Sequence, residues 1–110
     1  MNQVKIDAMQ KVLPVEKRVV GGKEVFCVSV NAMVKFYQLT VSPANFVKVF
    51  NSDALIEDVN SVTVGETVWM PIEYAIKIVE YRINKYGGGI NGPVIMEYLQ
   101  SFDETHEVAE

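Results

Sequence analysis

The chain has 110 residues, which fits one domain with a single hydrophobic core. Nearly half of the residues are apolar and 22% are charged, a composition typical of an ordinary folded protein. No uncharged apolar run of about 18 residues occurs, and the N-terminal segment carries charges where a signal peptide has its apolar core. We therefore expect neither membrane insertion nor secretion. The single cysteine cannot form an internal disulfide, so we also expect a cytoplasmic location.

The formal net charge of −4 is unevenly distributed along the chain. Residues 1–102 hold ten basic and ten acidic side chains, whereas residues 103–110 add four acidic ones. A neutral body differs from a strong DNA binder, which usually presents a basic face to the phosphates. We predict a single compact domain over residues 1–102, followed by a disordered acidic tail over residues 103–110.

The first predicted element is a β-hairpin over residues 12–30. Residues 1–10 show no clean periodicity and are interpreted as an arm or a short first strand. Gly21 and Gly22 then separate two β-rich runs, and a tight primed turn needs positive φ at both central positions. Pro14 indicates that the first strand begins late or lies at a sheet edge. The turn sets the expected cross-strand pairs: Val19 with Glu24, Lys17 with Phe26, and Val15 with Val28.

Two short helices are predicted next, over residues 31–38 and from Ser42 onward. A turn at Leu39-Thr40-Val41 joins them, and Ser42 is a good N-cap followed by a proline at the first helical position. Such a pair around a tight turn is typical of a helix-turn-helix. Helical spacing directs one set of side chains inward, Phe46, Val49 and Phe50. It places another set on the opposite side, Asn45, Lys48 and Asn51.

The second half of the chain is predicted as a small hairpin and two helices. Residues 62–64 and 68–69 form the strands, with Gly65-Glu66 as their turn. Pro71 opens a long helix that ends at Gly87, and its apolar stripe comprises Ile72, Ala75, Ile76, Val79 and Ile83, widened by Ile78 and Tyr86. Pro93 begins a last helix, with Ile95, Tyr98 or Leu99, and Phe102 inward. The predicted class is α+β: an N-terminal β-hairpin, a helix-turn-helix-like pair, a small β wing and C-terminal helices.

Residues 30–83 resemble the winged helix-turn-helix of the excisionase and MerR-like group. Three segments carry the resemblance in order: VSPANFVKVFNS resembles a recognition helix, VTVGETVWMPIEYA a wing leading through proline into a helix, and IEYAIKIVEYRI the closing helix. The resemblance implies that Ala44, Asn45 and Lys48 face the major groove and that the segment around Gly65-Glu66 touches the DNA backbone. The chain is also similar to DNA-binding domains of the phage antirepressor type, which implies a mobile-element origin.

The sequence departs from the winged-helix pattern at several places. The group usually has a small residue within its first helix and a glycine in its turn, whereas the nearby positions here hold Phe36 and Thr40. The wing carries Glu66 where the group has arginines, and the N-terminal hairpin is additional.

These observations define a hypothesis of sequence-specific DNA binding and transcription regulation. An asparagine can read adenine and a lysine can reach guanine in the major groove. The predicted DNA-contacting residues are Ser42, Ala44, Asn45, Lys48, Asn51 and Gly65, with Lys17, Arg18 and Lys23 as candidate phosphate contacts. A homodimer would place two reading helices one DNA turn apart. The alternative for the helix pair is a purely structural part of an α+β core.

No motif indicates an enzyme, a metal site or a cofactor. Gly87, Gly89 and Gly92 match G-x-G-x-x-G but follow a helix, whereas a dinucleotide site needs a preceding strand. The only histidine, His106, and the only cysteine, Cys27, form neither a zinc cluster nor a nucleophile–base pair. A local acidic cluster is most simply an exposed turn: Asp53, Glu57 and Asp58.

A second hypothesis is a protein-binding module without DNA binding. It would act as an inhibitor or assembly factor of a phage or other mobile element, with a host or phage protein as partner. The neutral body and the acidic tail favour it. The C-terminal half is also rich in the aromatic residues that often anchor protein interfaces: Trp69, Tyr74, Tyr81, Tyr86 and Tyr98.

Overall fold

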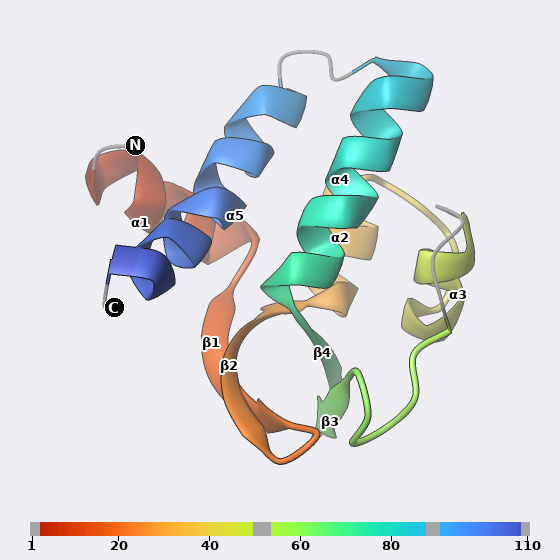
Figure 1. Cartoon of the computed structure of the whole chain (residues 1–110). Helices are drawn as coiled ribbons and strands as arrows, with labels where there is room; N and C mark the ends of the chain where they lie inside the picture. Colours follow the sequence, from red (N-terminus) through yellow and green to blue (C-terminus); the bar gives the residue numbers. More distant parts are fainter. Residues whose placement is uncertain (1–2, 50–53, 88–90, 109–110) are drawn as a thin grey trace.

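The computed structural model describes residues 3–49, 54–87 and 91–108 and has a mixed α+β architecture, as predicted (Figure 1). The described chain has five helices and four strands. In order they are α1 (Gln3–Val12), β1 (Val15–Val20), β2 (Lys23–Ser29), α2 (Val30–Phe36), α3 (Pro43–Val49), β3 (Val62–Val64), β4 (Thr67–Pro71), α4 (Ile72–Tyr86) and α5 (Asn91–Val108).

The four strands form one antiparallel sheet in the order β1-β2-β4-β3. The predicted register of the first hairpin is confirmed, because Val15 pairs with Val28, Lys17 with Phe26 and Val19 with Glu24. Gly21 and Gly22 have φ of 59° and 80°, as a primed turn requires. Pro14 immediately precedes β1, which is an edge strand. The two hairpins, predicted separately, are joined where β2 pairs with β4.

The sheet is curled (Figure 1), and it carries apolar side chains on both faces. Alternation along the strands sends Val15, Val28 and Met70 into the main core beneath the helices. The opposite face carries a smaller cluster of buried side chains, Val20, Cys27 and Trp69, with Val25 and Val62 packed against it. This two-sided burial explains why both faces of the first hairpin carry apolar as well as charged residues.

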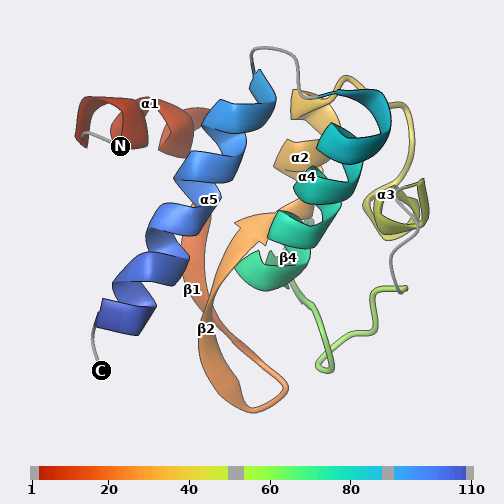
Figure 2. The same cartoon turned by 45° about the horizontal axis from the view of Figure 1, so that its top comes forward.

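The first segment is a helix, so its interpretation as an arm or a short strand is wrong. Helix α1 has no buried residue, and ten residues are too few for a stable isolated helix. Tertiary contacts hold it in place: the Gln10 side chain donates to Val15 O at 3.0 Å and accepts from Val15 N at 2.7 Å. Helices α1 and α5 lie side by side in both views (Figures 1 and 2). The missing periodicity reflects this shallow packing.

Helix α2 begins one residue earlier than predicted, because Ser29 caps it by accepting from Ala32 N at 3.1 Å. At its other end, Gln38 adopts a left-handed conformation with φ of 56°. Gln38 N donates to Lys35 O, and Leu39 N donates to Val34 O, each at 3.0 Å. This paired pattern is the usual left-handed helix C-cap, in which glycine is the common residue. Gln38, and not Thr40, therefore occupies the position of this turn at which glycine is usual.

Replacing Gln38 by glycine should stabilise the protein. Glycine removes the cost of a left-handed backbone, and this gain exceeds the added freedom of the unfolded chain. We expect the unfolding free energy to rise by roughly 0.5–1 kcal/mol, measured by urea denaturation. The same substitution at Gln100, an exposed residue inside α5, should instead lower it by about 1 kcal/mol. A loss of stability in Gln38→Gly would contradict the strained cap.

The long helices α4 and α5 pack against each other and cover the sheet (Figures 1 and 2). The predicted stripe of α4 is confirmed at its buried members, Ile72, Ala75, Ile78 and Val79, but Tyr86 is 61% exposed. Gly87 ends α4 as predicted. Helix α5 begins at Asn91, before Pro93, and buries Ile95, Tyr98 and Leu99. It continues to Val108.

Candidate nucleic-acid interface

Helix α3 presents a polar side to solvent and buries an apolar side. Its first turn is closed by Ser42 O, which accepts from Asn45 N and Phe46 N at 3.0 Å each. Phe46 and Val47 are fully buried, whereas Ser42, Asn45 and Lys48 are exposed. The outward placement of Asn45 and Lys48 thus agrees with the prediction. Ala44 lies in the same helix, and Asn51 falls outside the described residues.

Ring contacts hold α3 against the end of α2. The rings of Tyr37 and Phe46 stack with centroids 6.3 Å apart and an interplanar angle of 17°. The guanidinium of Arg82, on α4, lies 4.4 Å from the centroid of the Tyr37 ring. Burial raises the pKa of Tyr37, and the positive charge of Arg82 partly opposes this rise. The position of α3 is therefore fixed through Tyr37 and Phe46 to both α2 and α4.

The β3–β4 hairpin is fastened to the start of α2 by one side chain. Asn31 Nδ2 donates to Glu66 O at 3.1 Å, and Asn31 Oδ1 accepts from Val68 N at 2.9 Å. The turn residues Gly65 and Glu66 remain exposed. Sequence reasoning missed Asn31, because a helix-opening asparagine gives no sign that it will bind a strand more than 30 residues away. Helices α2 and α3 and this hairpin consequently form one connected unit.

A second contact steadies the outer strand of this hairpin. The carboxylate of Glu57 accepts from Thr63 N at 2.8 Å and from Thr63 Oγ1 at 2.7 Å. These hydrogen bonds to the charged form lower the pKa of Glu57. The sequence predicted an exposed acidic turn. Glu57 and Asp58 are exposed, and Asp53 lies outside the described residues.

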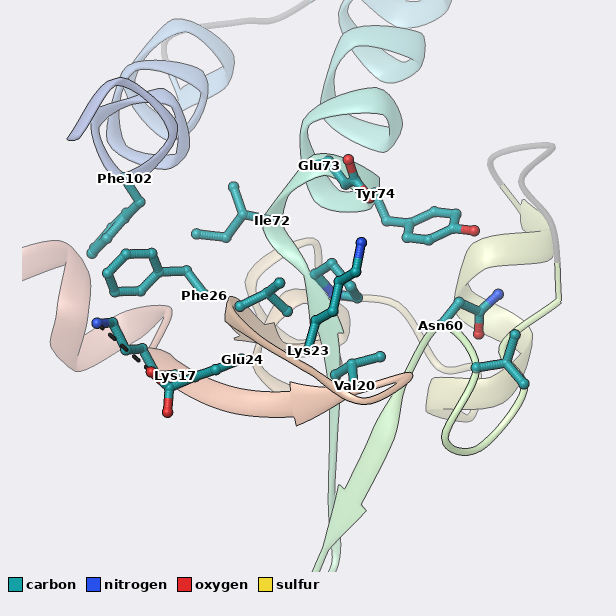
Figure 3. A pocket seen from close by; sticks show the side chains of 13 residues that line it. Lys17, Val20, Lys23, Glu24, Phe26, Asn60, Ile72, Glu73, Tyr74 and Phe102 are labelled. Carbon is teal, nitrogen blue, oxygen red and sulfur yellow. Dashed lines mark ion pairs between the residues drawn. The ribbon is translucent and has the colours of Figure 1, made fainter. Parts of the chain in front are cut away.

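The three candidate phosphate contacts do not share one face. Lys17 and Lys23 both line a groove beside the first hairpin (Figure 3). Lys17 lies 3.9 Å from the Glu24 carboxylate and 5.3 Å from the Phe26 ring centroid. Successive residues of a strand point to opposite faces, so Arg18 leaves the sheet on the face opposite to Lys17. The hairpin therefore carries dispersed cations and not a single basic stripe.

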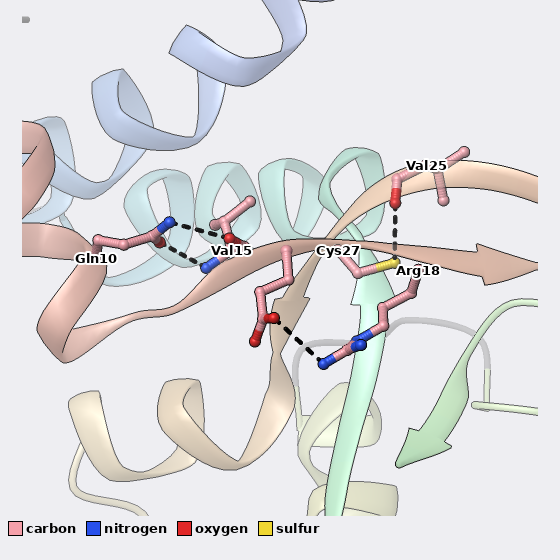
Figure 4. Close-up of polar contacts among 6 residues, drawn as sticks. Gln10, Val15, Arg18, Val25 and Cys27 are labelled. Atoms are coloured by element: carbon pink, nitrogen blue, oxygen red, sulfur yellow. Dashed lines mark hydrogen bonds and ion pairs between the residues drawn. The ribbon is translucent and has the colours of Figure 1, made fainter.

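Arg18 packs on the smaller core. Its guanidinium lies 3.4 Å from the Glu16 carboxylate (Figure 4). It also lies 4.7 Å from the centroid of the Trp69 ring. Within the described part of the chain, two buried donors have no hydrogen-bond partner, Arg18 Nε and Trp69 Nε1. A buried donor without a partner costs folding free energy, and the cation–π contact and the ion pair with Glu16 offset this cost only in part.

Cys27 belongs to this smaller cluster and is fully buried, with Sγ 3.7 Å from Val25 O (Figure 4). Burial raises the pKa of the thiol to about 11, and the nearby charge of Arg18 opposes this only weakly. A buried neutral thiol is a poor nucleophile and a poor metal ligand. Among residues 3–49, 54–87 and 91–108, no cluster of three histidine, cysteine or acidic side chains is arranged to hold a metal ion.

No family model matches the sequence, and no curated protein or solved structure shows a significant match to it. Over the described helices, none is long and apolar enough to cross a membrane.

Proposed function

We propose that the protein binds duplex DNA, with α3 in the major groove and the β3–β4 turn against the backbone, and that it regulates transcription. The polar outward side of α3 carries this proposal. Its exposed Asn45 and Lys48 project from a helix whose other side is anchored by the fully buried Phe46 and Val47. A reading helix needs this combination, because side chains that contact base edges must extend from a rigid backbone.

The second support is the connection between the helix pair and the hairpin. Asn31 binds the turn residue Glu66 and Val68 on β4, so the β3–β4 turn is held at a fixed place relative to α2. Backbone amides at such a turn suit phosphate contacts that set the orientation of a protein on DNA.

The aromatic residues that favoured a protein partner are mostly inside. Trp69 and Tyr98 are buried, and Tyr74 and Tyr81 are half-buried. Of these five residues, only Tyr86 is largely exposed. Because an anchor for a protein partner must be accessible, this observation favours DNA binding over the protein-binding alternative.

Fluorescence anisotropy with duplex DNA tests the proposal. Binding to random duplex should fall steeply between roughly 50 and 200 mM salt, because phosphate contacts release counterions. On a selected site, Asn45→Ala should weaken binding by about tenfold and relax sequence preference, whereas Lys48→Ala should also reduce the salt dependence. Lys11→Ala, on exposed α1, removes the same charge elsewhere and serves as the matched control.

Two outcomes would contradict the proposal. The first is no binding to any duplex at low salt. The second is an equal effect of Lys11→Ala and Lys48→Ala, which would mean that net charge and not α3 determines the affinity.

A further inference from the structure

A groove of about 710 Å³ lies between the first hairpin and the first turn of α4 (Figure 3). Its volume falls within the range of small-molecule sites. Four separate parts of the chain line it: the β1–β2 hairpin, residues 59–60, the junction of β4 with α4, and α5. Its apolar lining includes Val20, Val25, Phe26, Pro71, Ile72 and Phe102.

Two polar parts of the lining are already engaged. Lys17 lies beside Glu24 at 3.9 Å. Asn60 uses its amide group within its own loop, accepting from Ile56 N at 2.6 Å and donating to Ala54 O at 3.0 Å. These groups shape the groove and offer little to a ligand.

Two opposite charges of the lining have no such partner within the described chain. Lys23 extends its ammonium group into the groove toward the first turn of α4 (Figure 3). Glu73 lies on that turn, and no ion pair joins the two side chains. The groove therefore presents one positive and one negative group above an apolar wall that includes Phe26 and Ile72.

We infer that this groove binds a small zwitterion with a large apolar side chain, of the chemical class of the free aromatic or branched amino acids. The carboxylate of such a molecule pairs with Lys23 and its ammonium group with Glu73. Its side chain then packs against Phe26, Ile72 and Phe102 and leaves water. A simple anion would face the like charge of Glu73, and a simple cation would face Lys23, so the charge pattern selects a molecule that carries both.

This site is separate from the proposed DNA-reading side of α3, because it is built from the first hairpin, α4 and α5. Its occupancy is measured without DNA. A failure of the DNA proposal therefore leaves this inference standing, and the reverse also holds.

Isothermal titration calorimetry of the full chain with three related probes tests the inference. L-phenylalanine carries both charges, 3-phenylpropionate lacks the ammonium group, and phenethylamine lacks the carboxylate. We expect saturable binding of L-phenylalanine and at least about tenfold weaker binding of each of the other two, because each loses one charge-assisted contact.

Substitutions in the groove assign each contact. Lys23→Gln should weaken L-phenylalanine about tenfold without weakening phenethylamine, whereas Glu73→Gln should weaken L-phenylalanine without weakening 3-phenylpropionate. Both side chains are exposed, so the variants should fold. Lys77→Gln and Glu80→Gln, also exposed on α4, are the matched controls and should change nothing.

Three results would overturn the inference. One is the absence of saturable binding of L-phenylalanine up to roughly 10 mM, where the affinity would be negligible. Another is binding that is insensitive to both Lys23→Gln and Glu73→Gln. The third is an equal loss of affinity in the control variants.

Discussion

Replacing Phe46 by alanine should lower the unfolding free energy by about 3–5 kcal/mol. The side chain is fully buried in the main core and stacks on Tyr37, so its removal leaves a cavity and exposes the underside of α3. Because α3 has only seven residues, packing and not helix propensity keeps it folded. Phe46→Ala should therefore release α3 and also abolish the proposed DNA binding.

Urea denaturation of the full chain measures this effect. Phe46→Leu keeps most of the apolar volume and should cost less, which covers the case in which the alanine variant does not fold. Lys48→Ala, on the exposed side of the same helix, should change stability by no more than about 0.5 kcal/mol. A cost below about 1 kcal/mol for Phe46→Ala would mean that α3 is not anchored through this ring.

The second large effect is expected at Tyr98. Tyr98→Ala should also cost about 3–5 kcal/mol, since it empties a fully buried site that connects α5 to the N-terminal segment. The Tyr98 hydroxyl lies 2.6 Å from Gln10 Oε1 and 2.9 Å from Leu13 O and donates its proton to this pair of acceptors. Burial raises the pKa of Tyr98, so the hydroxyl keeps its proton at neutral pH and can donate it.

Tyr98→Phe separates the hydrogen bond from the packing. It should cost about 1–3 kcal/mol, because the buried oxygen of Leu13 then loses its donor while the ring remains. Tyr81→Phe is the control: Tyr81 is half-buried and its hydroxyl accepts from the exposed Lys85 at 3.0 Å, so little stability should be lost. If Tyr98→Phe were neutral in urea denaturation, the contact between α5 and the α1–β1 connection would not contribute to stability.

Local chemistry explains what could be predicted from the sequence. The diglycine turn determines the register of the first hairpin, because only residues that tolerate positive φ fit its two central positions. The helical period of the apolar residues in α4 identifies its buried side, and Gly87 marks its end. Tyr86 departs from this pattern because it lies on the last turn, beyond the reach of the sheet.

The candidate sites were less predictable than the elements that carry them. Exposure of Asn45 and Lys48 follows from helical spacing, since both lie opposite the apolar side of α3. The placement of Lys17 and Arg18 on opposite faces follows equally from strand alternation. The sequence alone did not show that Lys17 would lie beside Glu24 or that Arg18 would pack on the Trp69 ring. The groove around Lys23 and Glu73 has no sequence signature, because its walls come from four distant segments.

By itself, the sequence determined the α+β class, the first hairpin and most helix positions, since turn residues, caps and periodicity act over a few neighbouring residues. Only the tertiary structure decided the rest. It made α1 a helix through Gln10 and joined two hairpins into one sheet where β2 meets β4. These features depend on contacts between residues far apart in the chain, whose formation is set by how whole elements pack and not by local preference.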